Sequence, residues 1–178
     1  MNLKALVSLI AATFRRLSSL TWIPALLMRL FVGYFFMTSG WAKIHDLAGF
    51  ASNFAGWGIP YPAFNAALSA YTEFIGGALT IAGLGMRFVS VPMIINMAVA
   101  ILSVKLKEVS NLTDFVNLDE PLYGLAYFWL LFSGAGWVSL DAAIKLVIAT
   151  RFEQNGARRD AIGSPAKASD RSSQISAA

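Results

Sequence analysis

The segment PAFNAALSAYTEFIGGALTIAGLG, residues 62–85, contains a single charged residue, Glu73, near its centre. A run of this length and apolarity can cross a bilayer as a helix, because about 20 residues span the hydrocarbon core. A carboxylate inside such a run is rare, and by default it marks a candidate functional site with a buried partner. We therefore interpret residues 62–85 as a membrane-spanning helix that carries a functional residue.

The composition supports a membrane location for the whole chain. Of its 178 residues, 57% are hydrophobic and 13% are charged, whereas about 25% of the residues in an average soluble domain are charged. A surface so poor in charge fits contact with a lipid bilayer. The net charge of +4 favours anionic lipid head groups. Because no dense cluster of Lys and Arg is interleaved with aromatic residues, no nucleic acid is expected as a partner.

Three further apolar runs, residues 22–41, 88–104 and 122–138, are also long enough to cross a bilayer. Backbone N–H and C=O groups cannot stay unpaired in lipid, so each of these spans must be a helix. The predicted fold is therefore all-α, with a bundle of four transmembrane helices inside a membrane domain of residues 21–148.

The two ends of the chain differ from this domain. Residues 1–20 are predicted to form an amphipathic helix on the membrane surface, because apolar residues recur at helical spacing among basic ones. The apolar residues are Leu3, Leu6, Val7, Ile10, Phe14 and Leu17, and the basic ones are Lys4, Arg15 and Arg16. The alternative is a cleaved signal peptide, which the Arg15-Arg16 pair disfavours. A further helix is expected to begin near Ser139, capped by Asp141, and residues 149–178 are predicted to form a polar, disordered tail.

The distribution of Lys and Arg predicts the orientation of the chain. In a four-span arrangement, ten of these residues fall on the side of the two termini, and three, Lys43, Lys105 and Lys107, fall on the opposite side. Positively charged segments stay in the cytoplasm. We therefore expect a multi-pass protein of the cell (inner) membrane with both termini cytoplasmic.

Glu73 lies on a stripe of small residues, which lets helices approach closely and should turn the carboxylate toward the bundle interior. The stripe contains Ala66, Ser69, Ala70, Gly76, Gly77, Thr80 and Gly83. Arg29 in the first run is the predicted partner, and Arg29 with Glu73 is the candidate catalytic site. Two alternatives stay open: the pair could serve helix packing alone, or Arg29 could extend to the interface without meeting Glu73.

At a rise of about 1.5 Å per residue, Arg29 lies roughly 10 Å and Glu73 roughly 17 Å from the cytoplasmic edge, a difference that an arginine side chain can cover. Asn96 of the third run and Tyr127 and Trp129 of the fourth reach a similar depth, so one polar layer could form from all four helices. The chain has no cysteine and one histidine, His45. Disulfides, iron–sulfur ligation and metal or haem sites built on paired histidines are therefore excluded within the chain, and no metal is expected. Redox chemistry would need a non-covalently held ligand or a partner subunit.

Four pieces of sequence, in order, resemble the DoxX family of small four-helix membrane proteins. Arg29-Leu-Phe-Val-Gly33 with Ser39-Gly40-Trp-Ala-Lys43 is similar to the family's first helix, and Gly49-Phe50 with Gly58-Ile-Pro60 is similar to its loop. Glu73-Phe-Ile-Gly76-Gly77 through Gly83-Leu-Gly85 to Arg87 resembles its second helix, and Gly136-Trp-Val-Ser139-Leu140-Asp141 resembles its closing signature. The likeness covers about residues 27–144.

The resemblance implies a membrane-embedded component of a redox system, and we expect a quinone or similar lipid-soluble ring in an apolar pocket of the bundle. Glu73 would relay a proton there, and Arg29 or Lys43 would hydrogen-bond a ring oxygen. The candidate ligand-binding residues are Lys43, Asn96, Tyr34, Tyr71 and Trp129, the last three as aromatic rings that stack. The expected partner is a redox subunit or a second copy of the chain. Whether the chain is itself catalytic, as a subunit of a quinone-linked membrane oxidoreductase, stays open.

Two other classes of function compete with this one. A non-catalytic assembly or accessory membrane protein would use the polar layer only to hold its fold together. A carrier of protons or small solutes would use Glu73 as its switching carboxylate. Four helices without an inverted repeat leave such a carrier little room for alternating access.

Overall fold

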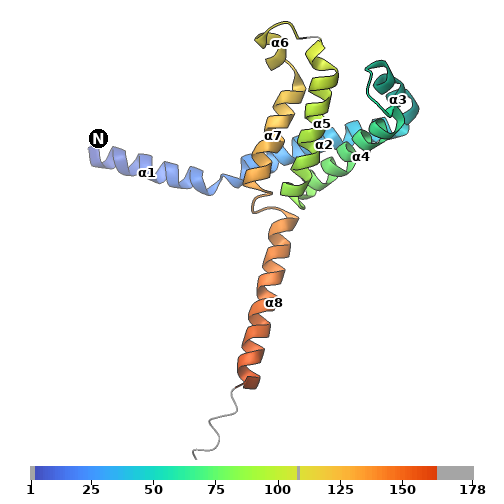
Figure 1. The fold of residues 1–178 in the computed structure, drawn as a ribbon. Coiled ribbons are helices and arrows are strands. Elements are labelled where there is room, and N and C mark those ends of the chain that lie inside the picture. Colours follow the sequence, from blue (N-terminus) through green and yellow to red (C-terminus); the bar gives the residue numbers. More distant parts are fainter. Residues whose placement is uncertain (1–2, 108, 164–178) are drawn as a thin grey trace, which may run out of the picture. The chain divides into compact units, whose positions relative to one another are not determined.

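The structure, a computed structural model, describes residues 3–107 and 109–163 and contains no strand in those ranges. The chain divides into two compact units, Met1–Ala142 and Ala143–Ala178. The helices are α1 (Leu3–Ser19), α2 (Trp22–His45), α3 (Leu47–Gly56), α4 (Pro62–Ala82), α5 (Met86–Ser103), the 3-10 turn η1 (Lys105–Lys107), α6 (Leu112–Val116), α7 (Asp119–Ser133) and α8 (Leu140–Gly163) (Figure 1).

All four predicted apolar runs form helices, namely α2, α4, α5 and α7, although the fourth run is helical only as far as Ser133. Two segments, Trp22–His45 and Met86–Lys107, are long and apolar enough to cross a membrane. Among the described residues, α4 and α7 do not meet that criterion: α7 has 15 residues, and α4 carries Glu73 with several other polar residues. The all-α fold is thus confirmed, whereas a crossing by four helices stays a prediction.

Helices α2 and α4 pack against each other through glycines, as their small-residue stripes predict. A Cβ added to Gly40 would lie 2.3 Å from the backbone N of Phe74, and one added to Gly77 would lie 2.4 Å from the backbone N of Met37. These contacts are backbone to backbone, so neither neighbour can turn away. The glycines therefore fix both the spacing and the antiparallel register of the two helices.

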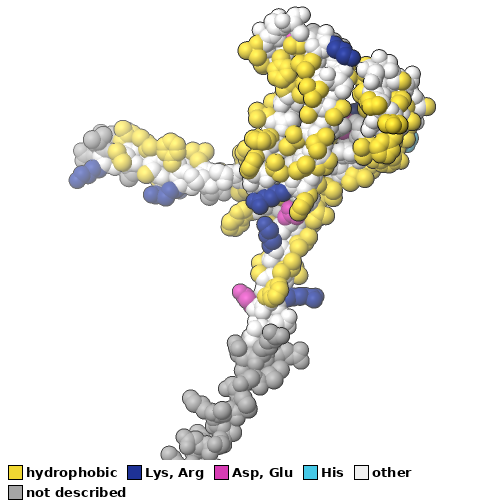
Figure 2. Space-filling model, in the orientation of Figure 1, with side chains coloured by type: hydrophobic (Ala, Val, Ile, Leu, Met, Phe, Trp, Pro, Cys, Tyr) yellow, Lys and Arg dark blue, Asp and Glu magenta, His cyan; other side chains and the backbone are white. Residues whose placement is uncertain are grey.

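Helices α5 and α7 form the second closely packed pair, and α4 also packs on α5. The buried cluster between them contains Phe36, Met86, Val89, Met93, Met97, Tyr127, Leu130 and Ala135. The ring centroids of Phe36 in α2 and Tyr127 in α7 lie 5.7 Å apart, so α2 also contacts α7. In the view of Figure 2, hydrophobic side chains cover much of the outer surface of these helices, as lipid contact requires.

The connection between the first two predicted runs forms a helix, α3, that the sequence analysis did not predict. The carboxylate of Asp46 accepts a hydrogen bond from the backbone N of Gly49 at 3.0 Å and so caps the N-terminus of α3. Gly58 and Tyr61 then take positive φ angles of 77° and 48° as the chain turns into α4. This turn holds α3 against α4.

The ends of the chain are helical as well. α1 agrees with the amphipathic pattern predicted for residues 1–20, and its apolar side chains Leu6, Val7 and Ile10 are exposed. α8 extends to Gly163, so the disordered tail predicted from residue 149 is wrong for residues 149–163. The remainder of that tail lies outside the described residues.

Candidate functional site

Glu73 is buried in α4 and forms an ion pair with Lys43 of α2. The Nζ atom of Lys43 lies 2.6 Å from both carboxylate oxygens. Two neutral donors complete the shell of the carboxylate: the Ser39 hydroxyl at 3.0 Å and the Nδ2 atom of Asn96 at 3.0 Å. The Oδ1 atom of Asn96 in turn accepts a hydrogen bond from the Ser69 hydroxyl at 2.8 Å. Three helices, α2, α4 and α5, therefore meet at this carboxylate.

Arg29 is not the partner of Glu73, and the predicted Arg29–Glu73 pair is wrong. The guanidinium is buried and donates hydrogen bonds to four backbone carbonyls. The carbonyls are those of Thr80 at 3.1 Å, Ile81 at 3.0 Å, Val138 at 2.9 Å, and Ala135. Arg29 thus ties the end of α4 to the loop that follows α7, which is a structural task.

The register of α2 against α4 explains this difference. The close contacts of Gly40 with Phe74 and of Gly33 with Gly77 place residue 73 beside residues 39–43. They place Arg29 beside Gly83, ten residues beyond Glu73 (83 − 73) and roughly 15 Å further along the helix. Depth counting placed the two charges in one layer because it did not include this register.

The loop after α7 is held from a second direction by Asp141. Its carboxylate accepts a hydrogen bond from the backbone N of Gly85 at 2.8 Å, and its own backbone N donates to the carbonyl of Gly83 at 3.2 Å. The cap of the following helix, α8, is Ser139 rather than Asp141: the Ser139 hydroxyl accepts a hydrogen bond from the backbone N of Ala142 at 3.1 Å. The prediction that Asp141 caps this helix is therefore wrong.

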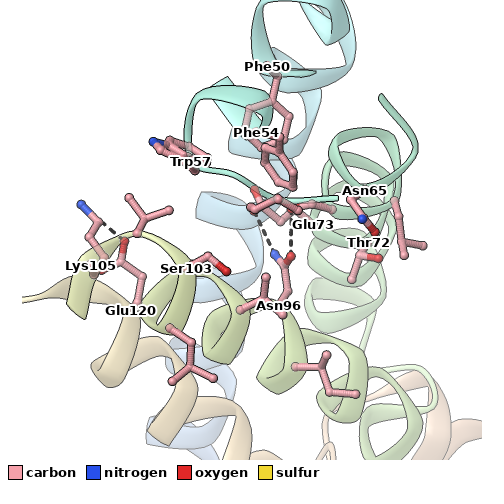
Figure 3. Close-up of a pocket in the computed structure, with 18 of the residues that line it drawn as sticks. Phe50, Phe54, Trp57, Asn65, Thr72, Glu73, Asn96, Ser103, Lys105 and Glu120 are labelled. Carbon is pink, nitrogen blue, oxygen red and sulfur yellow. Dashed lines mark hydrogen bonds and ion pairs between the residues drawn. The ribbon is translucent and has the colours of Figure 1, made fainter. Parts of the chain in front are cut away.

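A cleft of about 970 Å³ opens directly beside Lys43, Glu73 and Asn96. Figure 3 shows Phe50 and Phe54 of α3 above Glu73, with Asn96 below it. The remaining lining is mainly apolar and comes from the α3–α4 connection, α4, α5 and η1; it includes Trp57, Ile59, Pro60, Leu68, Pro92, Ile95, Val99 and Leu102. The cleft therefore joins the polar group at Lys43, Glu73 and Asn96 to a mainly apolar surface. Other polar residues of the lining are Asn65, Ser69, Thr72, Ser103, Lys105, Lys107 and Glu120.

Of the predicted ligand-binding residues, Lys43 and Asn96 line this cleft and Tyr34, Tyr71 and Trp129 do not. Those three aromatic side chains are exposed elsewhere on α2, α4 and α7. The aromatic residues of the cleft are Phe50, Phe54 and Trp57, which lie on or next to α3. The only sequence signal for them is the spacing of three and four residues between aromatic side chains, which becomes informative once this connection is known to be helical.

The negative charge of Glu73 is balanced within the site. Glu73 accepts from an ammonium, a hydroxyl and an amide, so its negative charge is matched by Lys43 and by two dipoles. The Nζ atom of Lys43 also lies 5.0 Å from the ring centroid of Phe50, within range of a cation–π contact. Within residues 3–107 and 109–163, no group of three or more His, Asp or Glu is placed to hold a metal ion.

Comparison with known proteins agrees with the sequence resemblance. Residues 25–106 match the family model named DoxX. This part of the chain belongs to the DoxX family. The matched DoxX range includes Arg29, Lys43, Glu73 and Asn96, and ends before α6 and α7. The closing signature at residues 136–141 therefore lies outside it.

A curated relative from Bacillus subtilis (strain 168), described as "Putative oxidoreductase CatD", is 36% identical over 85 residues. The alignment covers 48% of this chain and 62% of the relative, so the chain spans less than two thirds of that protein. No solved structure matched significantly. DoxX proteins are membrane-associated, which fits the apolar helices of this chain.

Proposed function

We propose that this DoxX protein is a multi-pass membrane component of a redox system and that its cleft binds the ring of a quinone. The observation that carries the proposal is the cleft beside Lys43 and Glu73, which is apolar and aromatic over most of its lining and has a buried polar group beside it. Sites for small organic ligands have this character: a mostly apolar surface supplies affinity, and a few polar groups fix orientation. The name of the curated relative, "Putative oxidoreductase CatD", favours a role in a redox reaction.

Four helices, α2, α4, α5 and α7, cross the membrane in this proposal. α4 has 21 residues, which corresponds to roughly 31 Å and matches a hydrocarbon core of about 30 Å. α7 is shorter, but the loop that follows it has its carbonyls at Ala135 and Val138 satisfied by Arg29. Non-helical backbone is tolerated at membrane depth where protein groups satisfy it. In the proposed orientation, which the bias of Lys and Arg supports, the protein lies in the cell (inner) membrane, both termini are cytoplasmic, and the cleft lies toward the opposite side.

Each polar residue of the cleft has a distinct role. An ammonium has three N–H donors, and the two oxygens of Glu73 engage Lys43 in a way that leaves a donor for a ring carbonyl. Asn96 and Ser39 hold the Glu73 carboxylate in place, so Lys43 points in a fixed direction. Phe50, Phe54 and Trp57 offer ring faces for stacking. A bound quinone supplies a ring that accepts two electrons and two protons, and a partner redox subunit delivers the electrons.

Fluorescence of Trp57 tests the proposal on the full chain in mild detergent. A quinone that stacks in the cleft should quench tryptophan emission saturably, and Trp57→Phe should remove most of the saturable quenching. Trp137→Phe is the matched control, because Trp137 is exposed and does not line the cleft. Quenching that survives Trp57→Phe unchanged, or that never saturates, would overturn quinone binding at this site.

Lys43→Met gives a second, independent test. Loss of the ammonium should weaken quinone binding at least tenfold, about 1.4 kcal/mol. Lys145→Met, a change on α8 at a residue that does not line the cleft, should leave affinity within twofold. Equal affinities for wild type and Lys43→Met in a folded protein would refute the role of Lys43.

A further inference from the structure

We infer that the cleft continues into a tail-binding groove between α4 and α5, so that the ligand is an amphiphile with a long hydrocarbon chain rather than a bare ring. The groove is defined by Leu68 of α4 and Ile95, Val99 and Leu102 of α5. This inference rests on the proposed function, in which α4 and α5 are membrane-embedded and the cleft holds a ring.

The side of the cleft formed by α3 and η1 is bridged by polar contacts. The Nζ atom of Lys107 in η1 donates to the carbonyl of Trp57 at 3.4 Å, which joins the two elements. Lys105 pairs with Glu120 of α7 at 3.8 Å, as Figure 3 shows, and so fastens η1 to the bundle. Contacts of this kind partly close the cleft toward the surface that the proposed orientation places in water.

The side between α4 and α5 has a different chemistry. Leu68, Ile95, Val99 and Leu102 all line the cleft, yet each is between 42% and 66% exposed. On α5 these residues follow Pro92 at spacings of three and four, which puts them in one stripe beside Asn96. An apolar stripe that starts at the polar group and ends on the open surface of two membrane helices is continuous with the hydrocarbon of the bilayer.

This juxtaposition sets the class of ligand. The polar head lies at Lys43 and Asn96, and an attached chain can leave along the apolar stripe. The lining of α4 and α5 also includes four uncharged polar residues, Asn65, Ser69, Thr72 and Ser103. In a bilayer a hydrocarbon chain is already out of water, so burying it in the groove adds little hydrophobic free energy. The groove therefore selects through shape: it accommodates a narrow chain beside a flat ring.

Binding of two quinones with the same ring, one with a decyl chain and one without a chain, tests the groove. Trp57 quenching measures both affinities, with each ligand's concentration expressed per volume of detergent micelle so that partitioning is not counted as binding. After this correction the wild-type protein should bind the decyl compound at least fivefold more tightly. Equal corrected affinities would overturn the groove, and would mean that ordinary lipid or detergent chains cover it.

Val99→Phe and Val91→Phe form a matched pair of variants. Both valines lie on α5 with similar exposure, but only Val99 lines the cleft. Val99→Phe should remove the preference for the decyl compound while leaving binding of the chain-free ring within twofold, and Val91→Phe should change neither. If Val99→Phe weakens both ligands equally, or neither, the groove is wrong.

The inference and the proposed function fail in different ways. Binding of the chain-free ring that depends on Lys43, without any preference for a chain, refutes the groove and retains the ring site. Absence of saturable binding for both compounds refutes the ring site and the groove together. Unfolding of Val99→Phe would not block the test, because Leu68→Phe probes the opposite wall of the groove with the same two ligands.

Discussion

The two buried charges of the helical bundle lie in contrasting surroundings. Arg29 is surrounded by backbone carbonyls and holds the end of α4 to the loop after α7. Glu73 is surrounded by side chains from α2 and α5, and a cleft lies beside it. Main-chain carbonyls accept from four of the five N–H donors of Arg29, and Arg29 does not line the cleft. Two partners of Glu73, Lys43 and Asn96, do line the cleft, so this group can exchange one partner for a ligand atom. The residue types alone do not distinguish these cases; their partners do.

Replacing Arg29 should give the largest loss in the free energy of unfolding. Arg29→Met removes every hydrogen bond to Thr80, Ile81, Ala135 and Val138 and leaves their carbonyls without this donor. Since hydrogen bonds to charged groups contribute about 1.5–3 kcal/mol each, the free energy of unfolding should fall by more than about 3 kcal/mol. Denaturant unfolding in detergent measures it. Arg29→Lys should recover only part of the loss, and a fully stable Arg29→Met protein would contradict a structural role.

Variants of the Lys43–Glu73 pair should destabilise the fold less and binding more. Lys43→Met leaves the buried carboxylate with neutral donors only, at a cost of about 1–3 kcal/mol. The double variant Lys43→Met/Glu73→Gln should recover at least half of that loss, because no unpaired charge remains. Neither variant should bind quinone with wild-type affinity. Recovery of binding together with stability in the double variant would show that the pair serves the fold alone.

Two glycines with similar φ angles, one beside Arg29 and one in the turn between α3 and α4, differ in the space around them. Gly83 and Gly58 have φ angles of 66° and 77°, so alanine is strained at both positions. A Cβ at Gly83 would also lie 2.3 Å from the Nη2 atom of Arg29, whereas one at Gly58 meets nothing within 4 Å. Gly83→Ala should therefore cost at least about 1 kcal/mol more than Gly58→Ala in the free energy of unfolding. Equal losses would mean that the guanidinium can move aside without cost.

The helix caps provide the smallest and sharpest contrast. Asp46 caps α3, which covers the cleft, and Ser139 caps α8. Alanine at either position should cost about 1 kcal/mol of stability. Only Asp46→Ala should also weaken quinone binding, by a few fold, because it loosens the helix that carries Phe50 and Phe54. Equal effects of the two alanine variants on affinity would separate α3 from the site.

The sequence predicted the four long helices, because apolar runs and small-residue stripes depend on local composition. It also predicted Glu73, Lys43 and Asn96 as residues of interest, and these three lie in contact. It could not predict their pairing, because the register of α2 against α4 depends on glycine contacts between residues far apart in sequence. The helix α3 was missed because its 10 residues are too few to show a clear period among connections.

The aromatic residues of the site were missed for the same reason. The predicted stacking residues Tyr34, Tyr71 and Trp129 lie on the long helices, but their side chains are exposed and do not line the cleft. Phe50 and Phe54 reach the cleft only because α3 folds back onto α4. A side chain's direction depends on tertiary packing, and depth counting along a span contains no information about it.

The contact between Gly40 and Phe74 has a consequence for motion. The backbones of α2 and α4 are so close at these glycines that even one methyl group would not fit. Sliding or separation of the two helices would therefore break the close glycine contacts between them. Lys43 and Glu73 sit on this stiff pair, whereas the walls above and beside them belong to α3 and α5. Any change in the volume of the cleft must therefore come from motion of α3 and α5, while Lys43 and Glu73 keep their positions.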